Sequence, residues 1–181
     1  MKNKLSFSLF VYSFILIFIT LGVWQLYRLE WKLKLISEIN NAISSEPVQF
    51  NSNSIKNFQK VSFEGKIDNE KIIYLYSLNE EGEPGFDIIN PINIENKNFL
   101  INRGWVKMNE KNNPFFTNTE KFVGIFREKS KSSYFKPEND LPSNYWFKLE
   151  DNDLEKYTGL KFSKYIIYLN DSNSTKIPKP K

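Results

Sequence analysis

The side chains available for chemistry are carboxylates, lysines and a few arginines, because the chain contains neither cysteine nor histidine. Two carboxylate pairs have the close spacing of a general acid and base, Glu80-Glu81 and Asp151-Asp153. Both pairs lie in segments that read as a turn or the start of a helix, and neither has an evident basic partner. We therefore expect solvated carboxylates here and no enzyme activity.

The missing residue types exclude several classes of site. A disulfide framework, a thiolate nucleophile, a His/Cys zinc site, a histidine base and imidazole-ligated haem all require cysteine or histidine. The sequence also lacks a P-loop, a nucleophile elbow and a dinucleotide fingerprint. No cofactor or metal is expected to be bound by groups of this chain.

The formal net charge of +4 comes from scattered basic side chains. The two densest basic runs, Lys129–Lys136 and Lys176–Lys181, lack the aromatic and glycine pattern of a nucleic-acid module. We expect solvated faces with some attraction to anionic lipid headgroups, and no nucleic-acid partner.

The elements that must position any site begin with Leu5–Tyr27, in which tyrosines are the only ionisable side chains. About 23 residues form a helix of roughly 34 Å, which is enough to cross a bilayer core of about 30 Å. Trp24, Tyr27 and Trp31 suit an aromatic belt at the lipid boundary. A cleaved signal is the alternative, but the apolar run is too long and lacks an A-x-A site, so we predict an uncleaved anchor in the lipid bilayer.

The helix is predicted to continue beyond the membrane as an amphipathic stalk. Leu29, Leu33, Ile36, Ile39 and Ile43 recur at helical spacing, and no helix breaker precedes the Ser44–Pro47 segment. This stripe is expected to pack on the soluble domain, with a partner helix as the alternative. The predicted organisation is a tail (1–4), a transmembrane helix (5–27), a stalk helix (28–45), a soluble β-rich domain (46–171) and a polar Pro/Lys tail (172–181).

About six strands follow from β-rich runs separated by turn signals. These runs are 61–66, 71–76, 86–94, 99–106, 121–126 and 162–169, with a hairpin turn at 95–98 and polar loops at 109–118 and 130–144. A short helix is predicted over 153–158, with Asn152 as its N-cap and Gly159 just after its end. The fold class is thus α+β and membrane-anchored: an N-terminal helix, then a mainly antiparallel twisted sheet or partly open barrel with one short helix.

Four motifs occur in the order found in one protein family. They are Leu21–Lys32 (LGVWQLYRLEWK), Gly82–Pro91 (GEPGFDIINP), Leu100–Val106 (LINRGWV), and Phe135–Asn139 (FKPEN) with Asn144–Phe147 (NYWF). Together they resemble the Surfeit locus protein 1 family of cytochrome c oxidase assembly factors. The matched residues are candidates for partner contact or for motif structure: Gly22, Trp24, Gln25, Arg28, Lys32, Gly82, Gly85, Phe86, Pro91, Asn102, Arg103, Gly104, Trp105, Phe135, Pro137, Asn139, Asn144, Trp146 and Phe147.

The resemblance implies a membrane-bound helper that assists haem a insertion into oxidase subunit I, with subunit I and other assembly factors as partners. It implies a soluble domain in the periplasm of bacteria or the intermembrane space of mitochondria, and we expect the bacterial inner membrane. The lysine and arginine count alone tilts weakly the other way. Haem a handling is implied by the family only, since no histidine is present as a ligand.

Each matched residue has a structural and a functional interpretation. Gly82 and Gly85 most simply provide a turn or a close backbone approach. Arg103 would either bind strand-end carbonyls or a glutamate of its own domain, or bind a propionate or a partner carboxylate through two hydrogen bonds. Trp105 and Trp146 are expected in core packing, with partner contact as the alternative.

Two features leave the function open. Gln25 and Arg28 would contact another membrane protein, or Arg28 would extend to lipid headgroups. The family normally has a second transmembrane helix after the soluble domain, with a histidine implicated in haem contact in bacterial members. We expect this chain to lack that helix, either as a truncated or degenerate member or because its haem handling does not use that ligand. The alternative function is a generic membrane-tethered periplasmic β-domain that serves as a scaffold or receptor.

Overall fold

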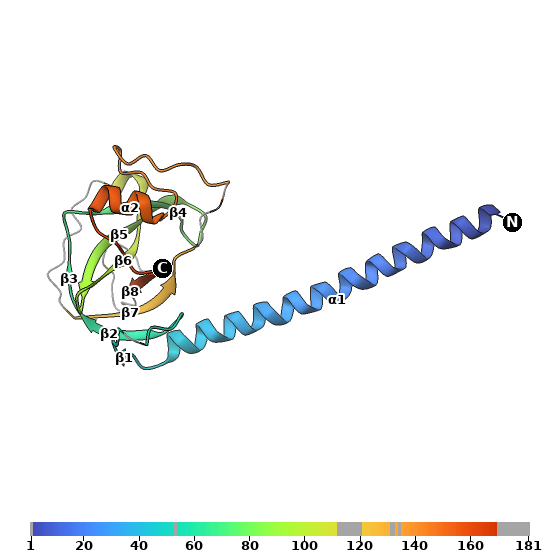
Figure 1. Cartoon of the computed structure of the whole chain (residues 1–181), viewed down its shortest axis with the longest axis horizontal. Helices are drawn as coiled ribbons and strands as arrows, with labels where there is room; N and C mark the ends of the chain where they lie inside the picture. Colours follow the sequence, from blue (N-terminus) through green and yellow to red (C-terminus); the bar gives the residue numbers. More distant parts are fainter. Residues whose placement is uncertain (1, 53, 112–120, 131–132, 134, 170–181) are drawn as a thin grey trace. The chain divides into compact units, whose positions relative to one another are not determined.

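The structure is a computed structural model that describes residues 2–52, 54–111, 121–130, 133 and 135–169 (Figure 1). The chain divides into two compact units, Met1–Asn41 and Ala42–Lys181. The predicted Pro/Lys tail lies outside the described residues, as do most of the predicted 109–118 loop and three positions of the 130–144 loop.

The first element is the long helix α1 (Lys2–Ser44). Its Phe7–Ser44 portion is long and apolar enough to cross a membrane, with a mean hydropathy of 2.2 in its most apolar window. The hydroxyls of Ser13 and Thr20 donate to the carbonyls of Phe10 and Leu16, so both polar groups are satisfied within the helix. Because no proline interrupts residues 2–44, the segments predicted as span and stalk form one continuous helix.

The second unit is built on one mixed sheet. Its strands are β1 (Val48–Gln49), β2 (Lys60–Glu64), β3 (Lys66–Ile67), β4 (Ile73–Leu78), β5 (Pro84–Ile94), β6 (Lys97–Lys107), β7 (Lys121–Glu128) and β8 (Tyr165–Leu169). The spatial order is β1-β2-β7-β8-β6-β5-β3, and β4 also pairs with β5. Only β1 with β2 and β6 with β8 are parallel, so the predicted mainly antiparallel sheet is confirmed.

The sheet curls into a partly open barrel. Gly65 alone separates β2, near one end of the strand order, from β3 at the other end. A β-carbon at Gly65 would lie 2.9 Å from the carbonyl oxygen of Asn93 on β5, so the two ends of the sheet meet closely there. One buried cluster accordingly draws on nearly every strand: Phe50, Val61, Phe63, Ile67, Ile92, Ile94, Phe99, Ile101, Phe122, Phe126 and Ile167.

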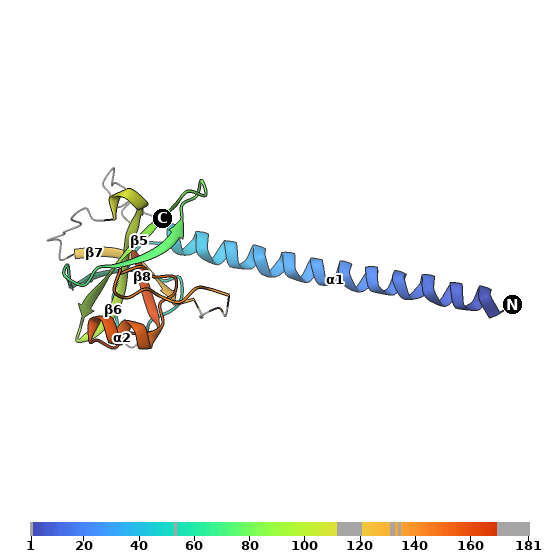
Figure 2. The same cartoon turned by 90° about the horizontal axis from the view of Figure 1, so that it is seen from above.

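A second cluster lies on the other face of the central strands, under the helix α2 (Asp151–Thr158). Leu154 of α2 and Trp146 pack there with Ile73, Leu100 and Ile166. Figure 2 shows α2 and β8 from above. A smaller third cluster of Phe86, Ile88 and Val106 completes the core.

Residue types in the sequence predicted the turns more accurately than the first residues of helices and strands. Glu95 and Asn96, both with positive φ, make the two-residue turn between β5 and β6, within the predicted hairpin turn. Gly159 is left-handed at the end of α2, with φ of 73°, as predicted. Asn152 as N-cap was wrong: α2 starts at Asp151, because Glu150 is the last residue with extended backbone.

Other boundaries also differ from the predictions. The last strand starts at Tyr165 rather than at residue 162, and Ser163 instead donates its amide to the carbonyl of Asn98. The two-residue strands β1 and β3 were not predicted. A 3-10 turn, η1 (Met108–Glu110), follows β6 at the start of the predicted polar loop.

Candidate functional site

The Asn-Arg-Gly-Trp motif forms a β-bulge in β6. Asp87 pairs with Trp105 and Ile89 pairs with Asn102, so Ile88 alone stands opposite two residues, Arg103 and Gly104. Gly104 has a φ of 122°, which side chains disfavour, and the Asn102 carboxamide accepts the Gly104 amide at 2.9 Å. Asn102 and Gly104 thus set the backbone that orients Arg103 and Trp105.

Trp105 packs directly onto the Gly-rich motif of the neighbouring strand. A β-carbon at Gly85 would lie 2.4 Å from carbons of the Trp105 indole and 2.2 Å from the carbonyl oxygen of Val106. The indole nitrogen of Trp105 donates to the carbonyl of Ser77 at 3.2 Å. Gly85 is therefore required for space and not for a special φ, and Trp105 is a core residue that joins β4, β5 and β6.

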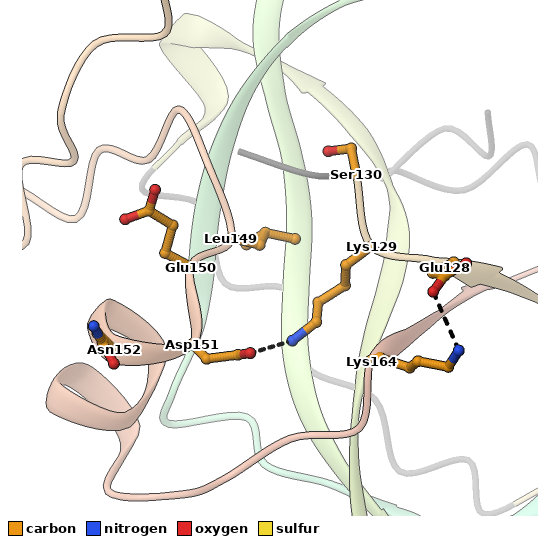
Figure 3. A pocket seen from close by; sticks show the side chains of 8 residues that line it. All are labelled: Glu128, Lys129, Ser130, Leu149, Glu150, Asp151, Asn152 and Lys164. Carbon is orange, nitrogen blue, oxygen red and sulfur yellow. Dashed lines mark hydrogen bonds and ion pairs between the residues drawn. The ribbon is translucent and has the colours of Figure 1, made fainter. Parts of the chain in front are cut away.

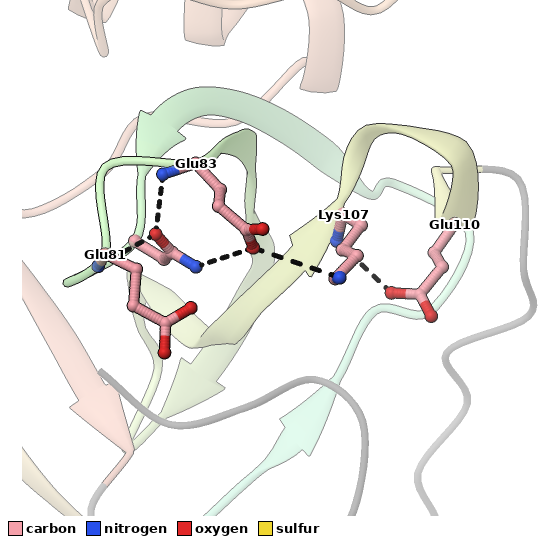
Figure 4. Close-up of polar contacts among 5 residues, drawn as sticks. Glu81, Glu83, Lys107 and Glu110 are labelled. Carbon is pink, nitrogen blue, oxygen red and sulfur yellow. Dashed lines mark hydrogen bonds and ion pairs between the residues drawn. The ribbon is translucent and has the colours of Figure 1, made fainter.

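Gly82 has a different role from Gly85. It lies in the exposed turn between β4 and β5 with a φ of 82°, and its amide donates to the carbonyl of Asn79 at 3.1 Å. The Asn79 carboxamide also accepts the amides of Glu81 and Glu83, and Glu83 lies 3.9 Å from the Lys107 ammonium. Figure 4 shows these side-chain contacts, from the turn at Glu81 and Glu83 across to Lys107.

Arg103 lies partly inside the domain. Its Nη1 donates to the side-chain oxygen of Asn90 at 3.4 Å, and the Asn90 Nδ2 donates to the carbonyl of Asp68 at 2.8 Å. Burial lowers the pKa of the Arg103 guanidinium below its ordinary value. Asn90 therefore holds the guanidinium of Arg103 through Nη1. A role for Arg103 in binding a carboxylate stays a prediction.

The late motif is held by two asparagines. Asn139 Oδ1 accepts the amides of Phe147 at 2.8 Å and Lys148 at 3.1 Å. Asn144 adopts a φ of 49°, donates to the carbonyl of Ile72 and accepts the indole N–H of Trp146, both at 2.8 Å. These contacts place Trp146 beside β4, where it forms a parallel bridge with Leu75.

Motifs two, three and four meet around an aromatic cluster. We use this name for Tyr74, Tyr76, Phe86, Tyr145 and Phe147. Tyr76 stacks on Tyr145 at 6.1 Å between ring centroids, and Phe147 lies 5.0 Å from Tyr145. Phe86 is buried, whereas the other four rings are half-buried and offer apolar edges to solvent. The cluster is the best candidate for a contact surface in the second unit.

Lys111 closes one side of this cluster. Its ammonium lies 5.3 to 5.5 Å from the rings of Tyr74, Phe86 and Tyr145, and it donates to the carbonyl of Ser143 at 2.8 Å. Burial lowers the pKa of Lys111, against the smaller opposing effect of Asp140. This contact could not be predicted from the sequence, because Lys111 is far along the chain from Tyr145.

A group of polar side chains near the bulge was also not predicted from the sequence. Arg127 stacks on the Tyr168 ring at 4.8 Å, beside Asp87 and Asn102. Burial raises the pKa of the Tyr168 hydroxyl; the Arg127 charge opposes that rise and Asp87 adds to it. This group supports the register of β5, β6, β7 and β8.

The remaining matched residues are not members of the cluster. Pro91 is buried on β5, where its carbonyl accepts the Asp68 amide, while Phe135 is 93% exposed and Pro137 is exposed in the loop before Asn139. Gly22, Trp24, Gln25, Arg28 and Lys32 are on α1, and the Arg28 guanidinium lies 5.3 Å from the Trp24 ring.

The carboxylate pairs are not arranged as an acid and a base. The expectation that they lack a basic partner was wrong for Asp151, which binds the ammonium of Lys129, a side chain only 9% exposed (Figure 3). Asp153 accepts the carboxamide of Asn139 at 2.7 Å. A pocket of about 400 Å³ lies beside Lys129, but its lining mixes both charges, with Glu128 paired to Lys164 at 3.2 Å.

Comparison with known proteins gives a family match over nearly the whole chain. The model of the SURF1 family matches residues 12–180. A SURF1-like protein of Rickettsia conorii is 29% identical over 174 residues, covering 91% of this chain and 70% of the relative. A SURF1-like protein of Dictyostelium discoideum is 31% identical over 126 residues, covering 62% of this chain and 46% of the relative. Surfeit locus protein 1 of Mus musculus is 28% identical over 165 residues, covering 77% and 54%.

Proposed function

Because the chain belongs to the SURF1 family, we propose that it is a membrane-anchored assembly factor for cytochrome c oxidase that catalyses no reaction itself. The single observation that carries this proposal is the family match over residues 12–180. The match includes both the apolar helix and the sheet domain, so a membrane-tethered head is the unit that acts. The chain spans about half the length of the Dictyostelium and mouse relatives, so the role of the whole protein is part of the proposal.

The proposed step is maturation of oxidase subunit I, around the insertion of haem a. In this step haem a is cargo, and the part of this chain is to hold the protein partner. The chain has no histidine or cysteine to bind the haem iron. Its contribution is therefore expected to be protein contact, with Arg103 as a candidate for pairing with a propionate or a carboxylate.

The proposed location is the bacterial inner membrane, with the sheet domain in the periplasm. The length and hydropathy of α1 support membrane anchoring, and the Rickettsia relatives are bacterial. Trp24, Tyr27 and Trp31 would lie at the lipid boundary, where aromatic side chains are favoured.

The aromatic cluster is the proposed partner surface of the sheet domain. Tyr74 and Tyr76 on β4, and Tyr145 and Phe147 in the segment before α2, are half-buried. Aromatic rings of this kind bury large areas when a partner covers them. Two of the four matched motifs contribute rings to this surface, Phe86 from one and Tyr145 and Phe147 from another, while Val106 of a third motif packs with Phe86 in the core. The pocket beside Lys129, by contrast, is lined mainly by charged and polar side chains.

Copurification tests the proposal. The tagged full chain is extracted in mild detergent from cells that express the oxidase, and bound proteins are identified by mass spectrometry. Recovery of subunit I, reduced in a Tyr76→Ala/Phe147→Ala variant, supports the proposal. Recovery of an unrelated envelope protein without subunit I would support a general scaffold or receptor instead.

A further inference from the structure

The C-terminal half of α1 has an apolar stripe with a regular period. Leu26, Leu29, Leu33, Ile36 and Asn40 follow one another at spacings of three, four, three and four residues. The four apolar side chains are 53% to 67% exposed, and Asn40 is also exposed. These spacings average 3.5 residues, the period of a left-handed coiled coil, in which the stripe faces another helix along its whole length.

The other side of the same helix has a different character. At 100° per residue, Trp24, Tyr27, Arg28, Trp31 and Lys34 lie on the side away from the stripe. Aromatic and basic side chains of this kind suit the lipid–water boundary, and the Arg28 guanidinium already lies over the Trp24 ring. The lipid boundary therefore accounts for that side and leaves the Leu/Ile stripe to be covered by a helix.

The position of Asn40 indicates which helix covers the stripe. Leu26, Leu33 and Asn40 occupy the a positions of the heptad, and Leu29 and Ile36 occupy the d positions. Leucine at a with isoleucine at d, as at Leu33 and Ile36, by itself favours three or four strands. A single asparagine at an a position instead specifies register and oligomer state, because it pairs with the same asparagine of an identical, parallel helix, and here it selects two strands. Copies of α1 anchored in one membrane are parallel and begin at the same height, so Asn40 would meet Asn40.

The flanking positions permit this pairing. In a parallel dimer, Gln25 faces Glu30 of the other copy, and Lys32 faces Ser37. These pairs place no like charges opposite each other. The d position that precedes Leu26 in this heptad pattern is Gly22, where a β-carbon would meet nothing within 4 Å. A residue as small as glycine allows two helices to approach closely at the lipid boundary.

We propose that α1 pairs with α1 of a second copy of this chain as a parallel two-stranded coiled coil through Leu26, Leu29, Leu33, Ile36 and Asn40. The pairing holds two sheet domains beside each other at one point of the membrane. It does not depend on what the sheet domains bind, so it stands or falls separately from the proposed role in oxidase assembly.

Disulfide trapping tests this proposal on a clean background, because the native chain has no cysteine. Single variants Leu33→Cys and Ile36→Cys place a thiol in the stripe, and Lys34→Cys and Glu38→Cys place one outside it on the same two turns. Membranes containing the full-length chain are treated with copper phenanthroline as the oxidant and run on a non-reducing gel. The stripe variants should give several-fold more disulfide dimer, because paired a or d positions bring the two β-carbons close enough for a disulfide.

Two further results complete the test. Two differently tagged copies of the cysteine-free chain, expressed together, should copurify, and Leu33→Glu/Ile36→Glu should abolish their copurification. Asn40→Leu should shift the detergent-solubilised chain from dimers to a mixture of larger oligomers. Equal trapping at all four cysteine positions, stronger trapping at Lys34 and Glu38, or copies that never copurify would overturn the proposal.

Discussion

Trp105 occupies the space where Gly85 would carry a side chain: a β-carbon on Gly85 would lie 2.4 Å from the indole ring. The same β-carbon would lie 2.2 Å from the carbonyl oxygen of Val106, which cannot move without disturbing the β5–β6 ladder. Two of the four sequence motifs are therefore one packing unit. Gly85 of one motif leaves the space that the Trp105 indole of the other motif occupies.

Gly85→Ala is expected to destabilise the sheet domain by about 1–3 kcal/mol, because the new methyl group overpacks a site bounded by backbone. Thermal unfolding of the full chain in detergent, followed by near-UV circular dichroism, measures the loss. Gly82→Asn is the matched control, since that position has open space and asparagine tolerates its positive φ. Equal stability of Gly85→Ala and the parent chain would show that Trp105 does not pack as described.

Asn144→Gly separates the two roles of Asn144. Glycine keeps the positive φ but removes the hydrogen bonds to the Ile72 carbonyl and the Trp146 indole. We expect a loss of about 1–3 kcal/mol, because the indole N–H of the buried Trp146 is left without its partner, and a weaker near-UV signal from Trp146. The Ile72 carbonyl still accepts the Tyr157 hydroxyl at 3.2 Å. Ser143→Gly, on the exposed neighbouring residue, removes a side-chain contact to Asp140 but none to Trp146, so it should leave the near-UV signal of Trp146 unchanged. A wild-type signal in Asn144→Gly would mean that backbone conformation alone fixes Trp146.

The stability of the domain is expected to fall in alkali. Burial raises the pKa values of Tyr74, Tyr157 and Tyr168 above the ordinary 10.0. Above pH 10 the unfolded chain releases these protons while the folded chain retains them, so the unfolded state is favoured as pH rises. This contribution is complete below pH 10 and is lost as pH rises through the folded-state values.

Tyr168→Phe should weaken this alkaline loss, since its ring is the most deeply enclosed of the three. The absorbance of ionised tyrosine, followed from pH 9 to 12, should lose one late-titrating group in the variant. The midpoint of urea unfolding should then decline less steeply above pH 10. A parent chain whose tyrosines all titrate together near pH 10 would contradict the burial of Tyr168.

The Phe147 ring of the aromatic cluster should be dispensable for folding but required for partner contact. Phe147→Ala removes a half-buried ring at its exposed edge, so we expect a stability loss of about 1 kcal/mol or less. Binding should fall by about tenfold or more if the ring is central to the interface. Phe135→Ala, in the most exposed of the matched residues, is the comparison. Unchanged copurification of subunit I with Phe147→Ala would place the contact elsewhere.

Local sequence signals were enough for features that depend on a few neighbouring residues. The apolar run predicted α1, the Glu95–Asn98 segment predicted a hairpin turn, and Gly159 predicted the end of α2. Each depends on backbone preferences or hydropathy within one segment. The mainly antiparallel sheet followed from the short spacing between strands.

Features that depend on distant residues were not predictable in the same way. The bulge at Arg103 and Gly104 exists only in relation to the register of β5. Lys129 lies 22 residues from Asp151, and Lys111 reaches the aromatic cluster from beyond β6. Asn152 looked like an N-cap by type, but the backbone turns helical one residue earlier, which composition alone does not reveal.

The most direct test of the proposed role is deletion of the gene and its restoration from a plasmid. Membranes of the deletion strain should have reduced haem a absorbance and reduced cytochrome c oxidase activity, and the full chain should restore both. Gly85→Ala should restore less than Gly82→Asn. Normal haem a content and normal oxidase activity in the deletion strain would contradict a role in oxidase assembly.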